Sequence, residues 1–319
     1  MPPHDKPKHV LVTGSHRSGS TYVGEVLEKS PNYFVIHEPF NEGSGIKGVE
    51  HPFPYAPVGK TSNYGALADR FMAGKYKYRP YTSGLENVPI TQKLKRYALH
   101  HTVGGTLQLK STYYKHVAHR NKAMIIKDPM ACLMSDYLST RHDVQVVALI
   151  RHPAAFYNSV KRMGWAADLA AEFSQSAVVA DLAPDAEDLL ELAAKSRVHQ
   201  VGVTWLFLYR SLHQFYEKHG ADWKVVRHED LCRQPFEVFE DIFRYLNVEM
   251  TETIRAYIRE TNQSDSSEAR GGATHDFFRD GQALADSWKS KVSSEETKIL
   301  RDITQSVAEH YYSDRDWEI

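Results

Sequence analysis

The chain has 319 residues and nearly balanced charge, with 39 lysines and arginines against 40 aspartates and glutamates and a formal net charge of −1. This balance argues against bulk affinity for nucleic acid or for anionic membranes. The two cysteines, Cys132 and Cys232, offer no disulfide framework and favour a reducing compartment. The first residues contain no apolar signal segment, and no stretch reaches the ~20 apolar residues that span a bilayer. We therefore expect a cytoplasmic globular protein without a transmembrane segment.

The run KHVLVTGSHRSGSTYVGEVLEKS, residues 8 to 30, predicts a strand, a loop and a helix in that order. Val10 to Val12 form an apolar β-branched run that suits a buried parallel strand. Gly14 and Gly19 bound the loop, and Ser20 opens a helix with apolar positions at helical spacing. The free N–H groups and the positive dipole at the start of a helix favour a bound anion. This run therefore predicts a site for a phosphate-like group.

The spacing of the two glycines is close to that of a nucleotide P-loop, but the lysine of that motif is missing. Ser20 stands where G-x-x-x-x-G-K-[ST] has its lysine, and Arg17 is the one cation in the loop. Without that lysine, ordinary hydrolysis of a nucleoside triphosphate is disfavoured. The alternative is a strand-to-helix turn that binds no ligand.

Further elements follow in chain order. A second strand is predicted over residues 33–39 and ends near Glu38. Residues 41–90, rich in glycine, proline and tyrosine, are expected to form a long ordered insertion without regular elements. Residues 94–117 are expected to be mostly helical. A third strand is predicted over residues 123–129.

The stretch VQVVALIRHPAAFYNSVKRMGW, residues 144 to 165, predicts a buried strand that ends at Arg151 and a helix that begins at Pro153. Ser159 lies on that helix. Ligands of open α/β sheets bind beyond the carboxyl ends of the strands, where Arg151 emerges. A guanidinium and a hydroxyl there suit a second phosphate, although an arginine after a strand is often only a surface charge.

The last third of the chain completes an alternating pattern. A long helical zone is expected over residues 184–219, a strand over 223–231, and a loop that closes over the ligand over 261–283. Strands that alternate with helices predict an α/β fold with a central parallel β-sheet flanked by helices.

Four motifs together resemble the sulfotransferases that use 3′-phosphoadenosine 5′-phosphosulfate as sulfuryl donor. RSGSTY, residues 17 to 22, is similar to the family's loop for the 5′-phosphosulfate, and R-x-P-x5-S from Arg151 to Ser159 is similar to its 3′-phosphate motif. WKVVRHEDL has His228 where the family's late strand has tyrosine, and SWKSKVSSEETKIL is similar to the family's last segment. The resemblance spans residues 8 to about 312.

The resemblance implies a P-loop NTPase-like sulfotransferase fold in one domain, 1–319, with an inserted acceptor or lid segment at about 41–120. It also implies which residues bind the sulfuryl donor: Arg17, Ser18, Gly19, Ser20, Thr21, Tyr22, Arg151, Ser159, Arg279 and Gly281. Tyr22 is expected to stack on the adenine, or else to be plain core. Arg270-Gly271-Gly272 is the alternative to the segment at Arg279 for closing on the 3′-phosphate.

Glu38, Lys127 and Arg17 are the candidate catalytic residues. Some bacterial carbohydrate sulfotransferases carry a glutamate in a similar E-P context, which suggests Glu38 as the base. Partial burial would raise the pKa of its carboxyl toward neutrality. The alternatives are that a histidine such as His37 is the base, or that Glu38 pairs with Arg17 or caps a turn. Lys127 would supply a second cation, unless it is a surface charge or a partner of Asp128.

The acceptor is expected to be a small molecule or glycan with a hydroxyl group: a carbohydrate, a glycolipid or a secondary metabolite. Arg17 in the loop resembles carbohydrate and bacterial sulfotransferases more than cytosolic aryl and steroid ones. The segment KYKYRPY, residues 75 to 81, would stack on sugars or phenols, or is only a solvated loop.

No metal is expected, because His100-His101 and the pair His116 and His119 lack ligands at usual spacing and sulfuryl transfer in this family needs no divalent ion. Two alternatives stay open. One is a P-loop-type phosphotransferase or NTPase in which Asp128 holds magnesium. The other is a non-catalytic nucleotide-binding relative. The sequence does not indicate the oligomeric state.

Overall fold

The computed structural model describes residues 7–79, 121–165, 167–262 and 281–319. They form a sheet of five parallel strands in the order β2-β3-β1-β4-β5, which confirms the predicted fold class. The strands are β1 (Val10–Gly14), β2 (Tyr33–His37), β3 (Ala123–Lys127), β4 (Gln145–Ile150) and β5 (Trp223–Arg227).

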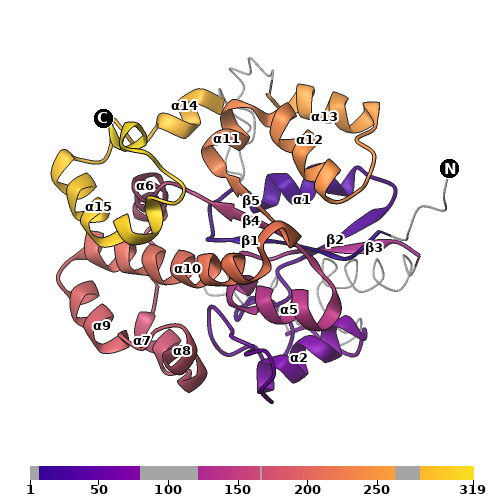
Figure 1. Ribbon diagram of the computed structural model, residues 1–319, viewed down its shortest axis with the longest axis horizontal. Coiled ribbons are helices and arrows are strands. Elements are labelled where there is room, and N and C mark those ends of the chain that lie inside the picture. Colours follow the sequence, from indigo (N-terminus) through magenta and orange to yellow (C-terminus); the bar gives the residue numbers. More distant parts are fainter. Residues whose placement is uncertain (1–6, 80–120, 166, 263–280) are drawn as a thin grey trace, which may run out of the picture.

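Helices cover both faces of this sheet (Figure 1). Because side chains alternate along a strand, Val10 and Val12 of β1 face one core and Leu11 faces the other. The first core is closed by α1 (Ser20–Glu28), α12 (Pro235–Tyr245) and α13 (Glu252–Asn262). The second is closed by helices that include α5 (Ser135–His142) and α10 (Arg197–His219). Burial on both faces explains the continuous apolar strands of the sequence.

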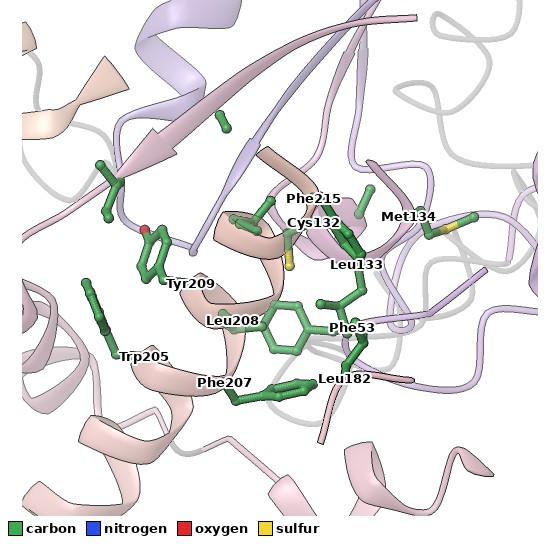
Figure 2. Packing of buried hydrophobic residues seen from close by; sticks show 14 of the residues in the cluster. Phe53, Cys132, Leu133, Met134, Leu182, Trp205, Phe207, Leu208, Tyr209 and Phe215 are labelled. Carbon is green, nitrogen blue, oxygen red and sulfur yellow. The ribbon is translucent and has the colours of Figure 1, made fainter. Parts of the chain in front are cut away.

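The second core also holds the segment that follows β2. Figure 2 shows Phe53 of this segment among Cys132, Leu133, Phe207 and Leu208. Phe53 is 2% exposed and Phe207 is fully buried. Burial of an aromatic side chain contributes about 1.5–3 kcal/mol, so these contacts hold the segment against α10.

Two predictions about secondary structure are wrong: one helix was missed and one strand was made too long. Residues 41–90 were expected to lack regular elements, but α2 (Asn63–Met72) lies there, and Ser62 caps it by accepting a hydrogen bond from the Gly65 N–H at 2.9 Å. The strand predicted over 223–231 ends at Arg227, because α11 (His228–Arg233) begins with acidic residues that suit a helix start. The predicted helix over 94–117 and most of the 261–283 loop lie outside the described residues.

The other predicted elements in the described residues agree with the structure, except that the strands predicted over 33–39 and 123–129 end at His37 and Lys127. The helix after Arg151 is α6, with proline at its first position, and the zone over 184–219 is two helices separated near Ser196. The remaining helices and 3₁₀ turns are α6 (Pro153–Met163), α7 (Leu169–Phe173), α8 (Ser176–Asp181), α9 (Ala186–Ala194), α14 (Gly281–Asp286), α15 (Ser294–Ala308), η1 (Pro129–Met134), η2 (Gly220–Asp222) and η3 (Asp314–Trp317). In the part of the chain that the structure describes, no helix has both the length and the apolar character required to cross a bilayer.

Candidate functional site

The loop between β1 and α1 has a backbone that only certain residues adopt. Gly14 has φ 138° and Gly19 has φ 98°. A Cβ on Gly14 would lie 2.1 Å from the carbonyl oxygen of Leu149 on the neighbouring strand, so only glycine fits there. Arg17 is also left-handed, with φ 70°, a strained conformation for a residue with a side chain. The loop therefore brings Arg17 to the carboxyl end of the sheet at a conformational cost.

Tyr209 of α10 anchors the start of this loop. Its hydroxyl donates to the carbonyl of Leu149 at 3.1 Å and accepts from the N–H of Ser15 at 3.2 Å. It also lies 2.7 Å from the Ser15 hydroxyl. Ser15 in turn accepts hydrogen bonds from the backbone and the hydroxyl of Ser18 at 3.3 and 2.6 Å. Tyr209 thus fixes the loop to β4, a role that sequence patterns did not predict because α10 lies far along the chain.

Arg17, Arg151 and Ser159, which belong to two separate sequence motifs, come together at the start of α1. The Arg17 Nε donates to the Ser159 hydroxyl at 3.2 Å, and the Arg151 Nη1 donates to the Arg17 carbonyl at 2.6 Å. Arg151 is 6% exposed, and its Nε is buried without a hydrogen-bond partner. Burial and the charges of Arg151 and Arg162 lower the pKa of Arg17. A bound anion would offset the repulsion between the two positive charges.

Glu38 and Lys127 form an ion pair on the same edge of the sheet. The Lys127 Nζ lies 2.6 Å from one carboxylate oxygen of Glu38, and Asn41 donates to the other at 2.9 Å. Burial alone would raise the pKa of Glu38, but Lys127 and Asn41 outweigh it and hold the pKa below its ordinary value. The expected rise toward neutrality is therefore wrong. Glu38 forms its ion pair with Lys127, whereas the sequence suggested Arg17 as a partner of Glu38 and Asp128 as a partner of Lys127.

Asp128 is fully buried and acts as a structural cap. Its two carboxylate oxygens accept hydrogen bonds from the N–H groups of Phe40 at 2.6 Å and Met130 at 2.9 Å. Burial and the nearby charge of Glu38 raise its pKa to about 7. A magnesium-dependent phosphotransferase would need the Asp128 carboxylate as a metal ligand, but both of its oxygens already accept backbone hydrogen bonds. Within the described residues no cluster of three or more ligand side chains could hold a metal, and the histidines at 100, 101, 116 and 119 lie outside them.

His16 is a residue of the loop that the sequence reasoning missed. Its ring lies between those of Phe53, Phe156 and Trp165, at centroid distances of 6.0, 5.5 and 5.5 Å. Its Nδ1 is buried without a hydrogen-bond partner. Burial and the charge of Arg17 lower the pKa of His16 to about 4, so the imidazole is neutral at pH 7. Its place in the loop, between Gly14 and Arg17, could have indicated from the sequence that His16 lies at the candidate site.

Tyr22 and Gly281 lie on elements near the loop. The Tyr22 hydroxyl lies 3.1 Å from that of Thr261 and accepts from the Asn262 side chain at 2.6 Å, which ties α1 to α13. Its ring meets that of Phe239 edge-on at 5.4 Å. Gly281 is the first residue of α14, a helix joined to α11 by an ion pair of 2.9 Å between Arg233 and Asp286. Arg279 and Arg270-Gly271-Gly272 lie outside the described residues.

Glu172 is a buried carboxyl group that makes stability depend on pH. It is 1% exposed, accepts from the Phe53 N–H at 3.1 Å, and burial raises its pKa from 4.5 to about 8. Between these pH values the folded chain keeps a proton that the unfolded chain has lost, so stability falls as pH rises. We expect Glu172→Gln, which cannot ionise, to gain about 1–3 kcal/mol over the wild type at pH 9 in urea unfolding.

The control for this prediction is Glu187→Gln on the exposed face of α9. It removes the same charge without a buried carboxyl, so its stability should follow the wild type at both pH 6 and pH 9. The same gain in both variants would show that Glu172 does not cause the pH dependence.

Comparison with known proteins identifies the family. The sequence profile of the sulfotransferase family matches residues 7–252, which include the loop, both arginines, Glu38 and Lys127. The chain belongs to the sulfotransferase family. A search of functionally curated proteins found no significant match.

This sulfotransferase is similar to several solved structures. The sulfotransferase domain from the curacin biosynthetic pathway is 17% identical, with a TM-score of 0.48 and coverage of 95% of this chain and 97% of that chain. The domain from the Synechococcus PCC 7002 olefin synthase is 18% identical, with a TM-score of 0.48 and 98% coverage of both chains. Sulfotransferase STF9 from Mycobacterium avium is 11% identical, with a TM-score of 0.46 and coverage of 96% and 77%.

Proposed function

We propose that this sulfotransferase moves the sulfuryl group of 3′-phosphoadenosine 5′-phosphosulfate to a hydroxyl of a carbohydrate, a glycolipid or a secondary metabolite. The observation that carries the proposal is the buried guanidinium of Arg151, whose Nε has no partner, beside Arg17 and Ser159. A buried donor of this kind is costly unless a ligand accepts its hydrogen bond, and a phosphate oxygen does so well.

The loop and the start of α1 would hold the 5′-phosphosulfate. Arg17 supplies a positive charge, and the backbone N–H groups of Gly19, Ser20 and Thr21 lie where a helix start favours an anion, whereas the N–H of Ser18 donates to the Ser15 carbonyl. Arg151 and Ser159 would bind the 3′-phosphate, with Arg279 and Gly281 closing from the other side. Tyr22 would border the adenine. The strained backbone of Arg17 is consistent with a residue placed for a ligand.

Glu38 would accept the proton of the acceptor hydroxyl. The oxygen of that hydroxyl attacks the sulfur in line, the bond between the sulfur and the phosphate oxygen breaks, and adenosine 3′,5′-bisphosphate leaves. Because the pKa of Glu38 lies below its ordinary value, its carboxylate is ionised at neutral pH and ready to take a proton. Lys127 orients Glu38 and supplies positive charge near the transferred group.

The segment at about 41–120 would receive the acceptor as an insertion in a single domain, 1–319. Its described part packs into the core through Phe53, whose ring lies beside that of His16 in the loop. This contact connects the insertion to the sulfuryl-donor loop. The cytoplasmic location expected from the free cysteines stays a prediction, as does the absence of a required metal.

Ligand-induced thermal stabilisation tests the proposal. We expect adenosine 3′,5′-bisphosphate without metal to raise the melting temperature, because a ligand at ~100 times its Kd adds ~2.7 kcal/mol of stability. ADP, which lacks the 3′-phosphate, should stabilise less at the same concentration. If ATP with magnesium stabilises the protein and adenosine 3′,5′-bisphosphate does not, the proposal is overturned and phosphoryl transfer is favoured. No response to any nucleotide would favour a non-nucleotide partner.

A further inference from the structure

The peptide group between Ser18 and Gly19 is held by a residue from the far edge of the sheet. The Ser18 carbonyl oxygen lies 3.1 Å from the Nδ1 of His228. His228 is the first residue of α11, directly after β5, and is 7% exposed. Although 210 residues separate the two, the imidazole contacts the loop where it enters α1.

The hydrogen bonds of His228 define its tautomer. A carbonyl oxygen only accepts, so Nδ1 must carry the hydrogen and Nε2 must accept. The Cys232 sulfur lies 3.5 Å from Nε2, and burial raises the pKa of this thiol to about 12, so it keeps its hydrogen and donates. Burial and the charges of Arg151 and Arg17 lower the pKa of His228, although its bond to Ser18 opposes them. The imidazole is therefore neutral, with its hydrogen on Nδ1.

The direction of the Ser18 carbonyl decides where the next N–H points. In a trans peptide the C=O and N–H bonds point in opposite directions, so a carbonyl held by His228 turns the Gly19 N–H away from His228. The preceding N–H, that of Ser18, already donates to the Ser15 carbonyl. The Ser18 N–H is therefore not available to a ligand. The N–H of Gly19 is the next one along the loop.

The backbone conformation at position 19 and the nearby imidazole of His228 favour glycine there. Its φ is 98°, and a Cβ there would lie 3.1 Å from the His228 Nδ1 and 3.2 Å from a methyl group of Leu231. The imidazole thus packs directly against the loop backbone. Arg151 holds the preceding carbonyl, that of Arg17, so two successive carbonyls of the loop are fixed by groups outside it.

We propose that His228 is a positioning residue that aims the Gly19 N–H at the 5′-phosphosulfate. The inference rests on the proposed function, because it assumes that the loop binds this group. In this role His228 acts through the Ser18 carbonyl and not by a contact with the nucleotide. Its hydrogen bond fixes the orientation of the Ser18 carbonyl, so that the Gly19 N–H is already oriented before the ligand binds.

Two variants and two nucleotides test this role. We expect His228→Leu to weaken adenosine 3′,5′-bisphosphate about tenfold in calorimetric titration, since one oriented hydrogen bond to a charged group is lost. The same variant should bind adenosine 3′-monophosphate as the wild type does, because that nucleotide has no 5′-phosphate. His228→Asn, whose side-chain amide nitrogen takes the place of Nδ1, should restore most of the affinity for the bisphosphate.

The outcomes separate three explanations. Equal loss for both nucleotides, or no rescue by asparagine, would mean that His228 only supports the fold and would overturn the inference. Unchanged affinity in His228→Leu would overturn it as well. Failure of the wild type to bind either nucleotide would instead refute the proposed function. Nitrogen-15 spectra of labelled histidine should show His228 with its hydrogen on Nδ1, and a hydrogen on Nε2 would contradict the proposal.

Discussion

Arg151→Ala should weaken the binding of adenosine 3′,5′-bisphosphate by about 30- to 150-fold, equal to about 2–3 kcal/mol, because the proposed function makes Arg151 a buried, charged hydrogen-bond donor to the 3′-phosphate. ADP, which has no 3′-phosphate, should lose much less affinity, and only through the Arg17 carbonyl that Arg151 also holds. Isothermal titration of both nucleotides to both proteins measures the difference. The effect should be large because Arg151 is 6% exposed, so water cannot replace its contribution.

Two further variants serve as controls for Arg151. Arg151→Lys keeps a positive charge but loses the planar fork of donors and the bond to the Arg17 carbonyl, so its affinity should be intermediate. Arg162→Ala removes an exposed arginine from α6, the helix that follows Arg151, and should change binding less than about threefold, since exposed charges are screened by solvent. Equal losses for the bisphosphate and ADP in Arg151→Ala would remove Arg151 from the 3′-phosphate site.

The fold was predictable where local patterns coincide with tertiary structure. Apolar β-branched runs predicted each strand, and Pro153 marked the start of α6. The helix α2 was missed because glycine and tyrosine dominate its surroundings, while the apolar Leu67 and Phe71, four residues apart, stabilise it by packing into the core. The end of β5 was missed because the strand was extended over the whole WKVVRHEDL motif, although Glu229 and Asp230 after Arg227 favour a helix start.

The candidate site was predictable in part. In a parallel sheet the carboxyl ends of the strands share one edge, which is why Arg17 and Arg151 could be expected to meet. The partner of Glu38 was not predictable, because it depends on the pairing of β2 with β3, which places His37 opposite Lys127. Tyr209 and His228 act on the loop from elements that no local motif connects to it.

Glu38→Gln is expected to lower kcat by about 10²–10⁴-fold, the usual contribution of a general base, and to leave adenosine 3′,5′-bisphosphate binding unchanged. The amide keeps the size of the side chain but cannot accept the proton. Since the pKa of Glu38 lies below 4.5, the wild-type carboxylate stays ionised between pH 6 and 8, and kcat/KM should show no loss from this group over that range. Activity should fall only as pH drops toward and below the pKa of Glu38. Steady-state rates with labelled sulfuryl donor across pH 4–8 measure this.

The choice between a base and a structural carboxylate rests on two matched variants. Glu42→Gln changes an exposed glutamate four residues away and should keep full activity. Lys127→Met removes the cation that pairs with Glu38. Because the charge of Lys127 is the main effect that lowers the pKa of Glu38, burial should then raise this pKa. The acid limb of kcat/KM should shift to higher pH in Lys127→Met and be absent from any residual activity of Glu38→Gln. Wild-type turnover in Glu38→Gln would rule out Glu38 as the base and direct attention to His16, whose neutral imidazole lies in the loop next to Arg17.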